Sequence, residues 1–210
     1  MKITLFGTQP YDRESFDRIR DAYGFDVTYH RSHLNAGNVA LAEGADVVCI
    51  FVNDTADAAT VARLSQLGVR LIALRCAGFN NVDLLSAAQH GIPVVRVPAY
   101  SPHAVAEHAV ALMLSLNRKI HRAYWRTRDG NFSLHGLLGF DLYGKTAGIV
   151  GTGRIARELI RILRGFGMEV IAYDLCPDEA YAAAAGIAYV PLDELYARAD
   201  IVSLHCPLTD

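Results

Sequence analysis

The sequence predicts an α/β fold in which parallel sheets are covered by helices on both faces. Three observations predict it: short β-branched runs alternate with longer helical stretches, the runs are continuously apolar, and a glycine-rich turn joins one run to an amphipathic helix. Continuously apolar runs are typical of strands buried on both faces. The expected strands are Ile3–Phe6, Val27–Tyr29, Val47–Val52, Leu71–Arg75, Val94–Val97, Ala147–Val150, Val170–Tyr173 and Ile201–His205.

Helical stretches separate these strands, and such a sustained rhythm indicates a doubly wound architecture. The stretch from 104 to 128 begins apolar on nearly all sides, so it must be buried between domains or against another subunit. We therefore divide the chain into a domain of about residues 1–100 and a second domain of residues 101–210. The expected helices are Glu14–Ala22, Thr55–Gln66, Leu84–Gln89, Ala104–Arg128, Ile155–Phe166 and Leu192–Ala197, with a short alanine-rich helix at Ala180–Gly186.

The composition is that of an ordinary soluble globular protein: 210 residues, 52% hydrophobic, 20% charged and a formal net charge of −2. This balance argues against nucleic acid as a partner, because phosphate neutralisation needs clustered Lys and Arg. No apolar run approaches the ~20 residues that span a bilayer, and the N-terminus lacks a signal-peptide pattern.

The four cysteines are far apart in the sequence and form no CxxC pair. Cys49, Cys76 and Cys206 lie in strand-like apolar runs, where a reduced cysteine behaves as a small buried hydrophobe. Cys176 lies outside such a run. We expect a cytoplasmic protein with free thiols.

The strongest local signal is a glycine-rich turn between a strand and a helix. Residues 151–156, GTGRIA, fit the pattern GxGxxG/A. Gly151 permits the tight turn, Gly153 lets a pyrophosphate approach the backbone, and Ala156 lets helix pack on strand. The helix N-terminus offers N–H groups to phosphates, and Arg154 can add a charge contact. The expected buried face of this helix consists of Ile155, Leu159, Ile162, Leu163 and Phe166.

The next strand ends in Asp174, where a carboxylate would accept hydrogen bonds from the adenosine ribose. A carboxylate there repels a 2′-phosphate, and residues 175–177 contain no arginine, so NAD is favoured over NADP. A glycine turn alone could be a plain βα connection. The flanking strand, helix and acid together favour a dinucleotide site.

A metal site is not expected. His103 and His108 are five positions apart, so on a helix they point about 140° away from each other and cannot hold one zinc ion. Together with Glu107 they are best interpreted as polar residues at a helix start near a domain cleft.

His205 ends a strand beside Cys206 and Pro207, at the sheet edge where ligands bind. It could lie near a cofactor, but an acid–base histidine needs a partner to hold its tautomer. We favour backbone contacts from Cys206 and Pro207 to the adenosine side.

The stretch Leu74–Leu84 begins as a strand and breaks at Gly78. Its backbone N–H groups could bind a small anion, or the segment could be an ordinary βα connection; the residues alone favour neither. Tyr100 lies in a proline-punctuated loop, where it either contacts a ligand or packs.

Taken together, these stretches resemble the NAD-dependent D-2-hydroxyacid dehydrogenase family, and within it the bacterial fermentative D-lactate dehydrogenases. The resemblance covers nearly the whole chain. The residues that carry it are Ala73–Leu84, Val94–Leu134, Tyr143–Ala156 and Asp200–Thr209.

The resemblance implies a flavodoxin-like substrate domain, followed by a doubly wound Rossmann NAD-binding domain, with a cleft between them. It places substrate at the loop of Ala77 and Gly78, with Tyr100 nearby. It also implies that the helix 104–128 pairs two subunits in a homo-oligomer. The expected cofactor-binding residues are Val105, Gly151, Thr152, Gly153, Arg154, Ile155, Asp174, His205, Cys206 and Pro207.

In that family the Arg, Glu and His of the reaction lie beyond the equivalent of Asp210. The chain therefore resembles the N-terminal two-thirds of a dehydrogenase, ending after the fourth strand of an incomplete nucleotide domain. We expect no catalytic residue within it, and an exposed apolar edge at Ile201–His205.

The leading hypothesis is an oxidoreductase in which NADH reduces pyruvate, or a similar 2-ketoacid, to the D-2-hydroxyacid, with the 210-residue chain itself inactive. The alternative is a non-catalytic NAD-binding or dimerisation module. Other substrates, such as glycerate, phosphoglycerate or formate, stay open. The loop of residues 79–81 favours lactate through the resemblance.

Overall fold

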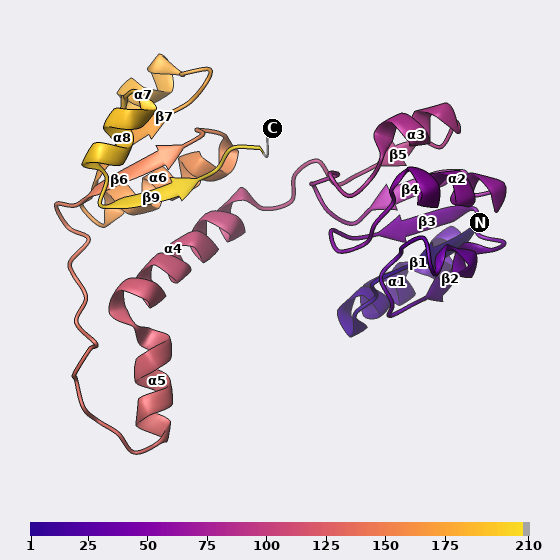
Figure 1. The fold of residues 1–210 in the computed structure, drawn as a ribbon, viewed down its shortest axis with the longest axis horizontal. Coiled ribbons are helices and arrows are strands. Elements are labelled where there is room, and N and C mark those ends of the chain that lie inside the picture. Colours follow the sequence, from indigo (N-terminus) through magenta and orange to yellow (C-terminus); the bar gives the residue numbers. More distant parts are fainter. Residues whose placement is uncertain (208–210) are drawn as a thin grey trace. The chain divides into compact units, whose positions relative to one another are not determined.

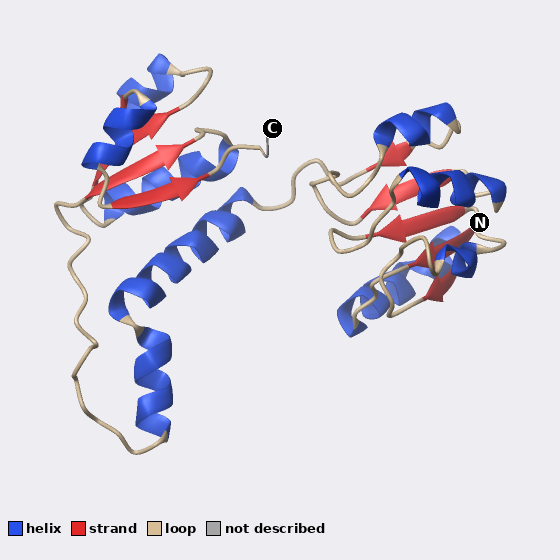
Figure 2. Ribbon diagram, in the orientation of Figure 1, coloured by secondary structure: helices blue, strands red, loops and turns tan. Residues whose placement is uncertain are grey.

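The structure is a computed structural model that describes residues 1–207. The chain divides into two compact units, Met1–Tyr100 and Ser101–Asp210, which can be followed by colour in Figure 1. Each unit is built on one parallel sheet with helices packed against it (Figure 2). The predicted α/β fold with parallel sheets is therefore confirmed.

The first unit has a five-stranded sheet in the order β2-β1-β3-β4-β5. Both faces of its central strand are buried: Val48 and Ile50 belong to one apolar cluster, and Val47 and Cys49 to another. This explains why the strand is continuously apolar in the sequence. The elements are β1 Lys2–Leu5, α1 Pro10–Tyr23, β2 Asp26–Tyr29, the 3₁₀ turn η1 Val39–Ala42, β3 Val47–Ile50, α2 Ala58–Gln66, β4 Leu71–Leu74, α3 Leu84–Gln89 and β5 Val94–Val95.

The second unit has a four-stranded sheet in the order β8-β7-β6-β9. Gly148 lies in its β6 strand because helix α8 packs closely there; a Cβ at this position would lie 2.5 Å from the Leu195 side chain. The two-residue strand β8 was not expected from the sequence. The elements are α4 Pro102–Arg118, α5 Ile120–Arg128, β6 Thr146–Val150, α6 Arg154–Gly165, β7 Glu169–Tyr173, α7 Glu179–Ala185, β8 Ala188–Tyr189, α8 Leu192–Arg198 and β9 Ile201–Leu204.

The single helix predicted over 104–128 is wrong, because the chain bends between α4 and α5 at Lys119. Lys119 adopts a left-handed conformation with φ of 52°, which costs a non-glycine residue about 1 kcal/mol. Polar contacts to a distant loop stabilise the bend. The Asn117 carboxamide exchanges two hydrogen bonds with the backbone of Phe140, at 2.8 and 2.9 Å, and the Lys119 ammonium donates to the carbonyl oxygen of Leu138.

The burial expected for this stretch is also only partly observed. Helix α4 buries Ala106 and Val110 and packs against α6, but Leu112 and Leu116 are exposed by 52% and 70%. Helix α4 is thus apolar on more of its surface than the single chain buries, and the part that carries Leu112 and Leu116 stays exposed.

All four cysteines are free thiols, and Cys49 and Cys76 are buried as expected. Cys206 is exposed instead, because β9 ends at Leu204 and the chain then leaves the sheet. Strand β9 lies at the edge of the described sheet, with Val202 and Leu204 exposed. Among the helices of residues 1–207, none has the length and apolarity that crossing a bilayer requires.

Candidate functional site

The strand register of the second unit brings the predicted nucleotide-binding residues to one sheet edge. Val150 on β6 pairs with Tyr173 on β7 and with Leu204 on β9. The residues that follow these strands therefore converge, as at the ligand-binding edge of other open α/β sheets. They surround a hollow of about 260 Å³ whose lining includes Gly151, Thr152, Gly153, Asp174, His205, Cys206 and Pro207.

The two glycines of the turn have different roles. Gly151 has φ of 87°, and a Cβ there would lie 2.8 Å from the carbonyl oxygen of His205. Only glycine fits this crossing without strain. At Gly153, a Cβ would meet no atom of residues 1–207 within 4 Å, so the backbone is open to an approaching ligand.

Helix α6 follows the turn and buries Ala156 fully, as predicted for close packing on the sheet. Leu159 and Leu163 are buried as expected. Phe166 is 37% exposed, because the helix ends at Gly165 and the ring lies beyond the core.

Asp174 is held by three hydrogen bonds from the protein. Its Oδ2 accepts from the backbone N–H and the hydroxyl of Thr152, at 2.6 and 2.7 Å, and its Oδ1 accepts from the N–H of Cys176 at 3.0 Å. These bonds, with the one from Cys176 contributing most, hold the pKa of Asp174 below its usual value. The carboxylate is therefore ionised at neutral pH.

Three residues predicted to bind the cofactor do not line this hollow. Arg154 and Ile155 form the first turn of α6, where Arg154 is exposed and Ile155 packs partly against the core. Val105 lies half-buried in the first turn of α4.

His205 is half-buried, and its Nε2 lies 2.9 Å from the hydroxyl of Ser203. Burial lowers the pKa of this histidine, so the ring is neutral at pH 7. At the start of α4, His103 Nδ1 lies 3.1 Å from Glu158 Oε2. In the part of the chain that the structure describes, no group of three His, Cys, Asp or Glu residues could hold a metal ion.

In the first unit, the loop containing Ala77 and Gly78 is fixed by neighbouring side chains. Arg96 donates to the carbonyl oxygen of Ala77 at 2.9 Å, and the Cys76 thiol donates to that of Gly78 at 3.2 Å. Gly78 itself is exposed. Tyr100 is 69% exposed at the end of this unit.

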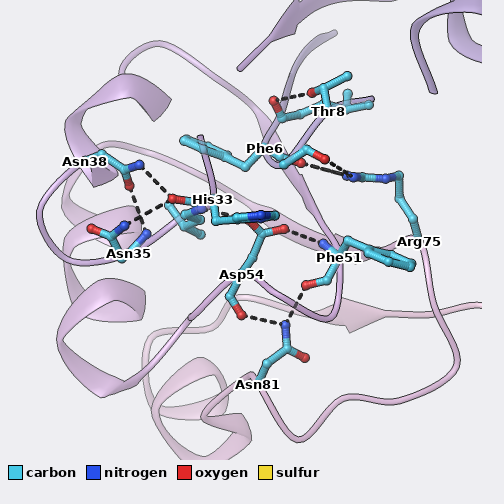
Figure 3. A network of polar contacts seen from close by, with 12 residues as sticks. Phe6, Thr8, His33, Asn35, Asn38, Phe51, Asp54, Arg75 and Asn81 are labelled. Atoms are coloured by element: carbon cyan, nitrogen blue, oxygen red, sulfur yellow. Dashed lines mark hydrogen bonds and ion pairs between the residues drawn. The ribbon is translucent and has the colours of Figure 1, made fainter. Parts of the chain in front are cut away.

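A buried carboxylate in the first unit was missed by the sequence analysis. Asp54 is 1% exposed and accepts hydrogen bonds from the N–H groups of Leu34 and Phe51 (Figure 3). Asn81, from the loop of residues 79–81, donates to the carbonyl oxygens of Phe51 and Asp54, both at 2.9 Å. The available signal was an aspartate two positions after the apolar run 47–52, where a polar group that becomes buried is expected to be hydrogen-bonded.

Comparison with known proteins supports the fold and the NAD-binding character of the second unit. Residues 110–210 match the family model for the D-isomer specific 2-hydroxyacid dehydrogenase, NAD binding domain. Along its whole length the chain is similar to members of the D-2-hydroxyacid dehydrogenase family.

Relatives of this family match along the whole chain. A 2-hydroxyacid dehydrogenase homolog of Haemophilus influenzae is 53% identical over 209 residues, which are 100% of this chain and 63% of the relative. The apo-structure of D-lactate dehydrogenase from Escherichia coli is 50% identical with a TM-score of 0.91, covering 100% of this chain and 66% of that one. An NAD-complexed D-isomer specific 2-hydroxyacid dehydrogenase from Lactobacillus delbrueckii ssp. bulgaricus is 29% identical with a TM-score of 0.69, covering 100% and 63%. The chain thus spans just under two thirds of the length of these relatives.

Proposed function

We propose that this chain provides the cofactor-binding and substrate-binding parts of an NAD-dependent D-2-hydroxyacid dehydrogenase. The reaction is the reduction of pyruvate, or a closely similar 2-ketoacid, to the D-2-hydroxyacid. The proposal rests on the hollow of the second unit, lined by Gly151, Gly153 and Asp174 among others, which we call the cradle. There an open glycine turn and an ionised Asp174 meet at one sheet edge. Similarity to D-lactate dehydrogenases supports the substrate class.

The cradle residues fit a dinucleotide. The open backbone at Gly153 and the first turn of α6 offer N–H groups to a pyrophosphate. Asp174 accepts hydrogen bonds from the adenosine ribose, and the backbone of Cys206 and Pro207 lies against the adenosine side. NADH, when bound, supplies the hydride that reduces the carbonyl carbon.

Residues of the first unit bind the substrate in this proposal. The loop of Ala77 and Gly78 offers backbone N–H groups to the 2-ketoacid carboxylate, and Arg96 and Asn81 hold that loop in place. Tyr100 contributes a contact beside it. Together these residues orient the substrate rather than move a proton.

His205 is not the proton donor in this proposal. The ring is neutral at pH 7 and hydrogen-bonds to Ser203 on the same strand. The family resemblance assigns the reaction's Arg, Glu and His to positions beyond residue 210. We therefore expect the 210-residue chain to bind NADH without turning over pyruvate.

We also propose that the second unit pairs with another copy of the chain. Exposed large apolar side chains gather on α4, on α5 and on the segment that follows, and such a surface is unusual unless a partner covers it. The side chains concerned are Leu112, Leu116, Ile120, Tyr124, Trp125, Phe132, Leu134 and Leu138. We place the protein in the cytoplasm, since free thiols suit a reducing compartment.

Two measurements on the purified chain test the proposal: the fluorescence change of NADH on binding, and NADH oxidation on addition of pyruvate. Saturable NADH binding without turnover is the expected result. Turnover by this chain would contradict the assignment of the proton donor, and His205→Gln would then be the first variant to examine. Absence of NADH binding would overturn the proposed function. NADH binding that no 2-ketoacid or 2-hydroxyacid alters would favour the alternative, a non-catalytic NAD-binding module.

A further inference from the structure

The carboxylate of Asp174 ends a hydrogen-bond chain that begins on another strand. The Tyr189 hydroxyl on β8 lies 2.8 Å from Thr152 Oγ1, and that oxygen lies 2.7 Å from Asp174 Oδ2. An ionised carboxylate only accepts, and a threonine hydroxyl has a single proton. The direction is therefore fixed: Tyr189 donates to Thr152, and Thr152 donates to Asp174.

This arrangement leaves the two carboxylate oxygens unequal. A carboxylate has about four lone-pair sites, two on each oxygen. Among the described residues, Oδ2 accepts from the Thr152 N–H and hydroxyl at 2.6 and 2.7 Å, whereas Oδ1 accepts from the Cys176 N–H at 3.0 Å. The N–H of Leu175 makes a smaller contribution to holding the carboxylate in its charged form. Oδ1 is thus the less firmly held oxygen, and a ligand hydroxyl in the hollow that Asp174 lines can hydrogen-bond to it while Oδ2 keeps both bonds from Thr152.

Thr152 is itself held firmly in place. The residue is 4% exposed, and its carbonyl oxygen accepts from Arg157 Nε at 3.0 Å. Arg157 is fixed in turn by Asp178 at 2.7 Å and by the Tyr181 ring, whose centroid lies 4.2 Å from the guanidinium. The residue that supports Asp174 is thus anchored on both its backbone and its side chain.

We propose that Thr152, supported by Tyr189, is a positioning residue that orients Asp174 and thereby sets selectivity for NADH over NADPH. The inference rests on the proposed function and deepens it. With Oδ2 occupied, Asp174 presents Oδ1 to a ribose 2′-hydroxyl. A 2′-phosphate offers negative charge at the same point and is repelled by the fixed carboxylate.

The test compares NADH and NADPH binding to the full chain and to three variants by fluorescence titration. Thr152→Val removes the hydroxyl at nearly constant shape, Thr152→Ser retains it, and Tyr189→Phe removes only the supporting donor. Losing one hydrogen bond to a charged group is expected to weaken NADH binding about tenfold in Thr152→Val and to leave NADPH binding unchanged. Thr152→Ser is expected to stay within about twofold of the unchanged chain, and Tyr189→Phe to fall between the two.

A second readout does not depend on nucleotide. Carbon-13 NMR titration of the Asp174 carboxyl group is expected to show a higher pKa in Thr152→Val than in Thr152→Ser, since a bond to the charged form is lost. If Thr152→Val does not fold, the same comparison is made between Tyr189→Phe and the unchanged chain.

Equal weakening of both nucleotides, or an unchanged titration of Asp174, would overturn the positioning role. If the unchanged chain does not bind NADH, the proposed function fails. The carboxyl titration then still decides whether Thr152 orients Asp174.

Discussion

The backbone N–H of Phe51 donates to the carboxylate of Asp54 at 2.5 Å, directly beyond the buried strand β3 (Figure 3). The same carboxylate accepts from Leu34 at 2.7 Å and lies 3.5 Å from His33 Nδ1. Asn81 then ties the candidate substrate loop to this turn through two carbonyl oxygens. The loop that carries Ala77 and Gly78 is thus tied, through Asn81, to a turn that the buried Asp54 carboxylate holds in shape.

We expect Asp54→Ala to lower the free energy of unfolding by about 2–4 kcal/mol, because two buried N–H groups lose their acceptor. Urea denaturation monitored by circular dichroism measures the change. Asp21→Ala is the matched control, since the Asp21 side chain is 92% exposed, and it should change stability by less than about 0.5 kcal/mol. Equal effects of the two substitutions would show that the Asp54 network contributes little.

The sequence predicted most of the strands because their signal is local. A strand buried on both faces needs a continuous apolar run, and β3 and β7 both show one. The break at Lys119 could not be predicted, since its cause is a contact between Asn117 and Phe140 in a loop 23 positions away. Asp54 was missed for the same reason: its partners Leu34 and Phe51 come from two separate segments.

The two glycines of the turn allow folding and binding to be separated. Gly151→Ala should destabilise the chain by about 1–3 kcal/mol, because the new Cβ would approach the His205 carbonyl oxygen in a left-handed backbone conformation. Gly153→Ala should fold normally, since its Cβ meets no described atom within 4 Å, yet it should weaken NADH binding at least tenfold by blocking the open backbone. Thermal unfolding and NADH titration of both variants check this. Normal NADH binding by Gly153→Ala would argue against a pyrophosphate at this turn.

The candidate site was predicted to the extent that its residues are close in sequence. Gly151, Gly153 and Asp174 belong to one strand–turn–helix–strand unit, whose geometry is fixed by a short pattern. The support of Asp174 by Tyr189, through Thr152, depends on strand β8, which was not predicted and whose partner residue is 37 positions away from Thr152. The contact between Arg96 and Ala77 likewise depends on side-chain placement across a loop.

The lowered pKa of Asp174 gives a pH-dependent prediction with a definite sign. A carboxyl group whose pKa is depressed by folding stabilises the folded chain above its ordinary pKa, and this contribution is lost as the pH falls through the lowered value. The unchanged chain should therefore be more stable than Asp174→Asn at neutral pH, and the difference should shrink as the pH falls below about 4. Denaturation curves for both proteins between pH 7 and the acid limit of folding measure it. A stability difference that grows toward acid pH would contradict the hydrogen-bonded, ionised state of Asp174.

The exposed apolar surface of α4 and α5 leads to a prediction about assembly. If this surface pairs with a second copy, Leu116→Glu should shift the chain toward monomer, because a charge would be buried in an apolar contact. Leu116 is 70% exposed in the single chain, so the substitution should leave the fold of the monomer intact. Leu85→Glu on α3 is the control: Leu85 is 79% exposed, belongs to the first unit and is not one of the side chains of the proposed surface. Sedimentation equilibrium of the unchanged chain and both variants gives the mass in solution. A dimer that survives Leu116→Glu, or a monomer in the unchanged chain at every concentration, would reject pairing through this surface.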